Sequence, residues 1–266
     1  MAEWSAFVGR LTLFPSAPAV IPLPSAPELY RRIWGSDPDN FQKAQNPLSA
    51  DVAQGKRGLM VAHCVVHPTR IDLNLGPAPD SGPTMNLPLI VNRNGLHAEM
   101  ERMMSALDSG GIVNPISRVA LYLQLLSPQP NSVKANEAVT SIIPVEYGVK
   151  ISNEEDFIFQ INKPYVSKAV LGTRMNCITK WSVERIQVVS ITLAGGSVPH
   201  GAQVPSPQTT EFVAGSMSFD VNNLPVSVPL PYVQQAALLR EARAVVNRIE
   251  QETGLNSKGF SNAEPN

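Results

Sequence analysis

The sequence predicts an α+β protein whose strands are mainly antiparallel. Apolar residues make up 43% of the 266 residues and charged residues 16%, so the chain can bury a substantial core. Runs in which apolar and polar residues alternate, as in strands, are separated by segments whose apolar residues recur at helical spacing. In the first half these elements follow the order strand, helix, strand, strand, helix, strand. That order is the ferredoxin-like βαββαβ pattern, which gives an antiparallel sheet with its helices on one face.

The elements of the first half are delimited by residues that end helices or strands. Pro15 closes a β-branched first strand, Gly35 ends the first helix, and His67-Pro68-Thr69 form the turn of a hairpin. Asn94 is expected to cap the second helix. The predicted strands are 8–14, 58–66, 70–76 and 116–126, and the predicted helices are 28–34 and 95–107.

The second half is expected to form a second antiparallel unit that packs with the first. Its predicted elements are a helix at 133–143, hairpin arms at 156–170 and 174–193, a loop at 194–210, a strand at 212–221 and a helix at 231–253. Near Arg185 the apolar phase of the second arm slips, which predicts a β-bulge. The predicted division is a ferredoxin-like half at 1–128, the antiparallel half with its terminal helix at 129–254, and a disordered tail at 255–266.

Charge and composition argue against several classes of protein. The formal net charge is -1, without the basic excess that is typical of a dedicated nucleic-acid binder. Two cysteines are too few for a secreted disulfide scaffold. The start of the chain lacks the pattern of a signal peptide, and no apolar run is long enough to span a membrane. The expected compartment is therefore the cytoplasm.

Motifs for familiar chemistry are absent from the sequence. There is no Walker pattern, no Gly-x-Gly-x-x-Gly and no Gly-x-Ser-x-Gly, so neither a nucleotide cofactor nor a serine nucleophile is predicted. His97-Ala98-Glu99 resembles half of a zinc deaminase motif, but its cysteine partner is missing. We therefore expect no cofactor.

Two neighbouring groups on one predicted hairpin invite a chemical interpretation. His63 and His67 share a strand face and could converge on a metal ion, although no third ligand has a defined place. A partly exposed histidine pair explains them more simply. Cys64 could pair with a histidine as a nucleophile, but adjacent strand residues point to opposite faces, so a small buried side chain is the preferred interpretation.

The long hairpin at 156–193 carries the strongest candidate for a binding site. Its polar residues could line an anion or peptide groove, or could form a solvated sheet face whose lysines protect a strand edge. These residues are Asn162, Lys163, Tyr165, Arg174, Asn176 and Lys180.

Candidate interface residues lie on the same hairpin and on the terminal helix. They are Trp181, Tyr232, Leu239 and Val246. Trp181 is either a core residue or an interface anchor, with the core preferred. The apolar stripe of the helix either binds a partner or covers the open face of the sheet, and we expect the second.

The run Phe157-Ile158-Phe159-Gln160-Ile161-Asn162, the later Phe219-Asp220-Val221 and the long terminal helix resemble a sporadically distributed group of uncharacterised bacterial proteins. The resemblance concerns the order of elements. It implies an α+β fold and a bacterial origin, and it assigns no residue a role.

The leading hypothesis is a non-catalytic binding or assembly component of an intracellular complex, which associates with a protein partner or with itself. It follows from the missing catalytic motifs, the near-zero charge and the 24 prolines in connecting loops. One alternative is a nucleic-acid or nucleotide-binding module in bacterial genome defence, although the strand at 116–126 offers only Tyr122 for stacking. Another is an enzyme of unrecognised type that uses Arg174, Lys180 or the histidine pair.

Overall fold

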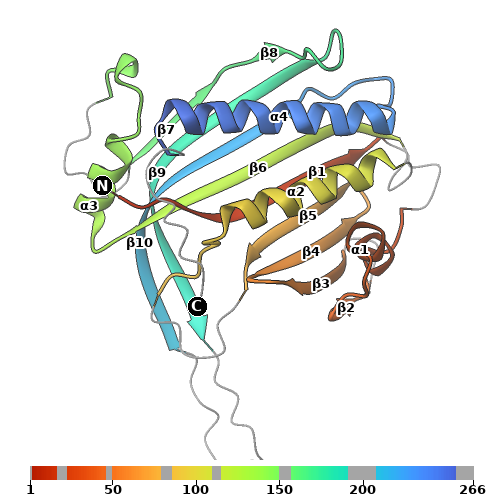
Figure 1. Cartoon of the computed structure of the whole chain (residues 1–266), viewed down its shortest axis with the longest axis horizontal. Coiled ribbons are helices and arrows are strands. Elements are labelled where there is room, and N and C mark those ends of the chain that lie inside the picture. The colour runs from red at the N-terminus through yellow and green to blue at the C-terminus, as the bar shows by residue number, and fades with distance from the viewer. Residues whose placement is uncertain are drawn as a thin grey trace, which may run out of the picture.

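The computed structural model of the chain describes residues 2–16, 23–45, 50–78, 86–109, 115–149, 157–190 and 208–255. It has a mixed α/β architecture, in which one large antiparallel sheet of ten strands packs with four α-helices in these ranges (Figure 1). None of the helices in the described ranges is long and apolar enough to cross a membrane.

The strands are β1 (Ser5–Pro15), β2 (Asn40–Gln42), β3 (Asp51–Arg57), β4 (Met60–His67), β5 (Arg70–Pro77), β6 (Ile116–Gln129), β7 (Ile158–Asn162), β8 (Tyr165–Val166), β9 (Arg174–Ser190) and β10 (Gln208–Asn223). The helices are α1 (Ala26–Trp34), α2 (Arg93–Asp108), α3 (Ser132–Thr140) and α4 (Tyr232–Glu252), with a short 3-10 helix η1 (Val145–Tyr147).

The strands form one continuous sheet across both halves of the chain. Their order is β2-β3-β4-β5-β1-β6-β10-β9-β7, and β8 pairs with the start of β9. Near the middle, β6 pairs with β1 on one side and with β10 on the other. The first and second halves of the sequence are therefore joined edge to edge by backbone hydrogen bonds.

All four helices pack on the same face of this sheet. In chain order, α1 contacts β3 and β4, α2 contacts β1, α3 contacts β10, and α4 contacts β6 and β10 (Figure 1). The side chains beneath them are fully buried, as Leu11, Leu121 and Phe219 illustrate. No described helix packs on the opposite side, which we call the open face. The expectation that the apolar stripe of α4 covers the sheet is confirmed, because Leu239 and Val246 belong to the main core.

Several predicted boundaries and one whole segment differ from the structure. Strands β2 and β3 were not predicted, because Gln54, Gly55 and Lys56 interrupt any apolar alternation. The cap of α2 is Asn92, whose side chain accepts a hydrogen bond of 2.8 Å from the backbone N–H of Gly95, so the prediction of Asn94 was wrong. The arm predicted at 156–170 is divided into β7 and β8.

The predicted loop and tail can be checked only in part. The loop expected at 194–210 ends earlier than predicted, because β10 begins at Gln208. Residues 191–207 lie outside the described residues. So does the predicted tail beyond residue 255.

The β-bulge predicted near Arg185 is absent. β9 and β10 pair in unbroken register from Met175↔Asn223 to Ser190↔Gln208. The apolar side chains change face along β9 because this end of the sheet extends beyond the helices. Here the apolar side chains are buried on the open face instead. We call the resulting small cluster the second core; it contains Leu87, Leu126 and Ala214, with Phe7, Leu89, Ile186, Val188 and Phe212 packed against them.

A close helix–sheet approach at Gly55 gives a stability prediction. A Cβ at this position would lie 2.9 Å from the ring carbon Cζ of Tyr30 in α1, and Tyr30 is 1% exposed. Gly55→Ala should therefore lower the free energy of unfolding by about 1–3 kcal/mol, measured by urea denaturation. Adding Tyr30→Phe should recover part of that loss, because it removes the hydroxyl nearest to the new methyl group. Strictly additive costs of the two substitutions would contradict this packing.

Candidate functional site

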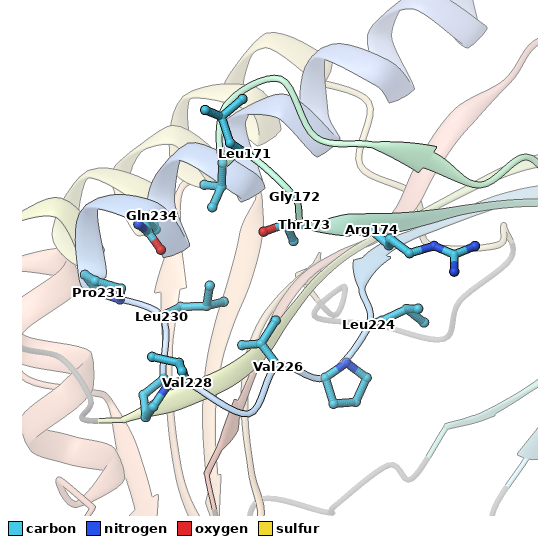
Figure 2. Close-up of a pocket in the computed structure, with 13 residues that line it drawn as sticks. Leu171, Gly172, Thr173, Arg174, Leu224, Val226, Val228, Leu230, Pro231 and Gln234 are labelled. Atoms are coloured by element: carbon cyan, nitrogen blue, oxygen red, sulfur yellow. The ribbon is translucent and has the colours of Figure 1, made fainter.

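An apolar groove lies where the β9 turn approaches the segment between β10 and α4 (Figure 2). Its cavity volume is about 620 Å³. One wall is the turn at 170–174, and the other is the proline-rich stretch at 224–231 that leads into α4. Backbone hydrogen bonds hold the second wall against β6, from the N–H of Val226 to the carbonyl of Ser117 and from that of Leu230 to the carbonyl of Ile116.

Large apolar side chains are exposed around this groove. Leu171 is 93% exposed and Val228 is 75% exposed. We call this set the apolar patch, and it consists of Leu171, Leu224 and Val228. Exposed apolar side chains gathered in one place mark interaction surfaces far more often than scattered ones do.

The turn that carries Leu171 is braced from below by α4. The carboxylate of Glu241 accepts hydrogen bonds from the backbone N–H groups of Lys168 (2.9 Å) and Ala169 (3.3 Å) and from the hydroxyl of Ser167. Gly172 then reverses the chain in the left-handed region, at φ 79°. Leu171 is therefore presented to solvent by a fixed turn and not by a loose loop.

A larger cavity, of about 1050 Å³, lies between α4, the η1 segment and the β7–β9 edge. We call it the α4 cavity. Trp181 stacks on Phe159 at 5.6 Å between ring centroids, and Tyr147 packs against both rings. Lys163 lies over Tyr147, 5.1 Å from the ring centroid, and its hydrogen bond to Tyr147 raises the pKa of the ammonium.

Two polar atoms of residues that line the α4 cavity lack a hydrogen-bond partner in the part of the chain that the structure describes. They are Nε1 of Trp181 and the hydroxyl of Tyr165, both buried from solvent. Burial, and then the charge of Glu241, raise the pKa of Tyr165, so its hydroxyl remains a donor at neutral pH. The cavity can therefore accept an aromatic or aliphatic body that carries hydrogen-bond acceptors.

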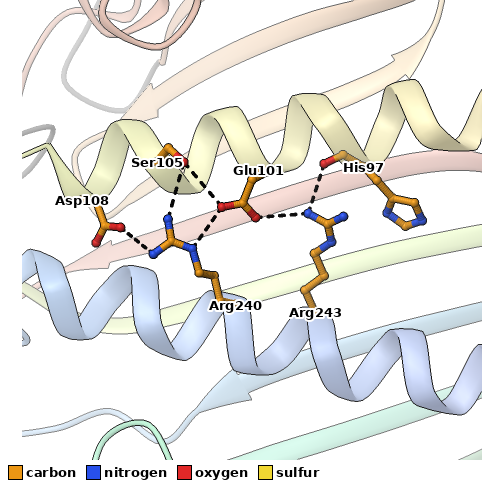
Figure 3. Close-up of polar contacts among 6 residues, drawn as sticks. All are labelled: His97, Glu101, Ser105, Asp108, Arg240 and Arg243. Atoms are coloured by element: carbon orange, nitrogen blue, oxygen red, sulfur yellow. Dashed lines mark hydrogen bonds and ion pairs between the residues drawn. The ribbon is translucent and has the colours of Figure 1, made fainter.

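Helices α2 and α4 are joined by a ladder of charged side chains (Figure 3). Glu101 of α2 accepts from Nε of Arg240 at 3.0 Å and from Nη1 of Arg243 at 3.3 Å. Arg240 also pairs with Asp108, and Arg243 donates to the carbonyl of His97. These side chains satisfy one another, so the ladder acts as a clamp between helices.

The structure divides the predicted polar set of the hairpin between three places. Asn162, Asn176 and Lys180 lie on the open face, where the amide of Asn162 donates to Asn176 and that of Asn176 donates to Asn222, each at 3.3 Å. Lys163 and Tyr165 line the α4 cavity on the helix side. Arg174 borders the apolar groove and points away from its other lining residues (Figure 2).

Of the predicted interface residues, only Tyr232 is at the surface, 41% exposed. Trp181, Leu239 and Val246 are at most 2% exposed within the chain, so they are not accessible to a partner. The apolar stripe that suggested an interface is used to cover the sheet. The accessible apolar residues of the patch come from loops, whose sequence has no periodicity to identify them.

The histidine and cysteine candidates do not belong to any group of described side chains that could hold a metal ion. His63 and His67 share the open face, but His63 is paired in register with Asn74 and His67 bonds Thr69 in its own turn. Within the described ranges, no group of three or more His, Cys, Asp or Glu side chains is placed to hold a metal ion. Burial raises the pKa of the Cys64 thiol and also that of Cys177, which keeps both thiols protonated at neutral pH.

Comparison with protein-family models, with curated proteins and with solved structures gave no significant match to this chain.

Proposed function

We propose that the protein is a non-catalytic assembly component that associates with a second copy of itself through the apolar patch. The observation that carries this proposal is the concentration of exposed apolar side chains around one groove, with Leu171 93% and Val228 75% exposed. Covering such side chains removes apolar surface from water, and this stabilises the associated state by about 25 cal/mol per Å² of buried apolar surface.

The shape of the patch favours a second copy as the occupant. Leu171 projects beside a groove of about 620 Å³, which is large enough to receive a leucine side chain. In a two-fold dimer each copy uses the same surface, so Leu171 of one chain can enter the groove of the other while its own groove is filled in return. The hydrogen bonds to Glu241 already hold the turn in one conformation in the free protein, which reduces the entropy lost on association.

Light scattering after size exclusion tests the proposal directly. The wild-type protein should show twice the chain mass of 28.7 kDa at micromolar concentration. The double variant Leu171→Asp/Val228→Asp should elute at the mass of a single chain, because association would bury two carboxylates without partners. Each substitution alone should weaken self-association at least about tenfold.

Leu59→Asp is the matched control, because Leu59 is 66% exposed in the turn between β3 and β4, away from the patch. It should leave the native mass unchanged. All three substituted side chains are exposed, so thermal unfolding should stay close to wild type. A wild-type protein that remains a single chain at high micromolar concentration contradicts the proposal, as does equal dissociation by Leu59→Asp.

We also propose that the N-terminal half is ferredoxin-like. The order β4-β5-β1-β6 with antiparallel neighbours supports it, because a βαββαβ unit has this order when both helices lie on one face. On this proposal β2 and β3 are an insertion between α1 and β4. The division at residue 128 is likewise a proposal, since the pairing of β6 with β10 makes the two halves share a sheet.

A further inference from the structure

The open face of the sheet carries two stacked pairs of an arginine and an aromatic ring. The guanidinium of Arg10 on β1 lies over the ring of Tyr122 on β6, 4.8 Å from its centroid. The guanidinium of Arg118 on β6 lies over the ring of Phe14 on β1, at 4.9 Å. Arg10↔Tyr122 and Phe14↔Arg118 are directly opposed in the β1–β6 register, so both contacts are built into the pairing of the two strands.

The surface between the two pairs is shallow, because the small side chains of Thr12 and Ala120 oppose each other there. Phe14 lies four positions after Arg10 on β1, which corresponds to about 13 Å along the strand. The platform therefore consists of two rings and two guanidinium groups around a shallow centre. Both rings are only partly buried, so each is accessible in part beside the guanidinium that lies over it.

Both guanidinium groups keep unused hydrogen-bonding capacity. Nε of Arg10 and Nε of Arg118 are shielded from solvent and have no hydrogen-bond partner among the described residues. Neither arginine has a carboxylate within ion-pair distance in the described part of the chain, whereas the arginines of α4 are largely paired with α2. A guanidinium without a carboxylate partner attracts an incoming anion, which can accept charge-assisted hydrogen bonds from it.

The carboxylates of the open face are mostly neutralised by the protein itself. Asp72 accepts from Thr12 at 2.7 Å and pairs with Arg70 at 2.8 Å. Glu184 accepts from Gln124 at 2.9 Å and lies 3.8 Å from Lys180. Asp220, opposite Tyr122 on β10, accepts from Asn222 but has no cation within ion-pair distance in the described ranges. Arg10 on β1 and Arg118 on β6 are thus positive charges without a paired carboxylate among the described residues, and Asp220 bounds them on one side.

We propose that this platform binds single-stranded nucleic acid. Bases would stack on Tyr122 and Phe14, and phosphates would pair with Arg10 and Arg118. Stacking on exposed rings beside arginine is how many proteins hold unpaired strands without reading their sequence. A duplex does not fit this role, because its bases are already stacked on one another. The platform and the apolar patch share no residue, so this function and self-association can be tested with separate variants.

Fluorescence anisotropy with a short labelled oligouridylate and a matching oligothymidylate measures the binding. The wild-type protein should bind both, more weakly at about 200 mM than at about 50 mM salt, because neutralising phosphates releases counterions. Arg10→Gln/Arg118→Gln should weaken binding at least about tenfold and make the logarithmic salt slope shallower by about 1.4, or about 0.7 per lost phosphate contact. Arg31→Gln/Arg32→Gln, which removes two exposed charges from α1 on the other side of the sheet, is the matched control and should bind like wild type.

Two further variants distinguish the contributions of base stacking and charge from nonspecific binding. Tyr122→Leu should weaken oligonucleotide binding about fivefold or more while leaving binding to heparin, which has no bases, unchanged. Asp220→Asn should tighten oligonucleotide binding, because it removes the carboxylate beside the platform. Thermal unfolding of each variant confirms that the fold is kept.

The proposal is overturned by any of three results with the wild type, the control or duplex, and by a fourth with Tyr122→Leu. The first three are no binding of the wild type to either oligonucleotide at low salt, an equal loss in the α1 control, or an equal preference for duplex. Binding that Tyr122→Leu leaves intact would identify a surface for acidic proteins or other polyanions, and would also overturn it.

Discussion

Glu250→Ala is expected to lower the free energy of unfolding by about 3–5 kcal/mol, the largest effect that we expect from substituting one buried residue. Glu250, near the end of α4, pairs with Arg93 in the first turn of α2, and their side chains are 0% and 6% exposed. Burial already lowers the pKa of Arg93 to about 10. Without the carboxylate, the guanidinium would remain in an apolar environment with no partner, and that uncompensated charge causes the loss.

Urea denaturation with a matched pair of controls isolates this effect. Arg240→Ala alters the same helix–helix contact, but its side chain is 39% exposed, so a cost of at most about 1 kcal/mol is expected. The double substitution Arg93→Met/Glu250→Leu should recover most of the stability, because a buried ion pair is often replaceable by apolar side chains of similar volume. If Glu250→Ala costs no more than Arg240→Ala, the pair is not buried in solution.

Mild acid is expected to destabilise the protein through His97. Burial lowers the pKa of His97 to about 4, helped by the guanidinium groups of Arg243 and Arg93, and its Nδ1 has no hydrogen-bond partner within the described ranges. The unfolded chain titrates this group near its ordinary value of 6.5. Between these two values the unfolded chain binds a proton that the folded chain excludes. Stability contributed by neutral His97 is therefore complete above about pH 6.5 and is lost as the pH falls toward 4.

The expected loss is on the order of 1–3 kcal/mol, allowing for the partial exposure of the imidazole. Urea midpoints measured from pH 7 to pH 4 should fall less steeply in His97→Gln, which cannot take up the proton, than in wild type. His63→Gln is the control on the open face, and it should change the profile less. A His97→Gln profile that parallels wild type would show that other groups dominate the acid response.

Much of the fold could be predicted because its signals are local. The stripe of α4 and the alternation of β5 each depend on a few neighbouring residues, and both elements occur where they were expected. β3 was missed because it is held between β2 and β4 by pairing, while its own Gln54-Gly55-Lys56 segment has no apolar pattern. The phase change in β9 was detected correctly but explained wrongly, since its cause is a second layer of side chains and not an extra residue.

The candidate sites were harder to predict because each depends on long-range register. Alternation along β1 is enough to place Arg10 and Phe14 on one face, yet only the pairing with β6 places Arg118 and Tyr122 beside them. Tyr122 is the one aromatic residue in the sequence at 116–126, because the second ring, Phe14, belongs to another strand. The apolar groove likewise joins two loops that are adjacent only because β9 and β10 pair.

The far end of the β9–β10 ribbon has a consequence for motion. Where β9 carries Trp181, the ribbon is held by the main core and its helices, but toward Ile186 and Val188 the described apolar residues that hold it are those of the second core. The small number of apolar contacts there makes local opening much less costly than global unfolding. We therefore expect the ribbon to behave as two foldons, with a distal part whose amide protons exchange through brief local fraying and a proximal part that is protected until the whole molecule unfolds.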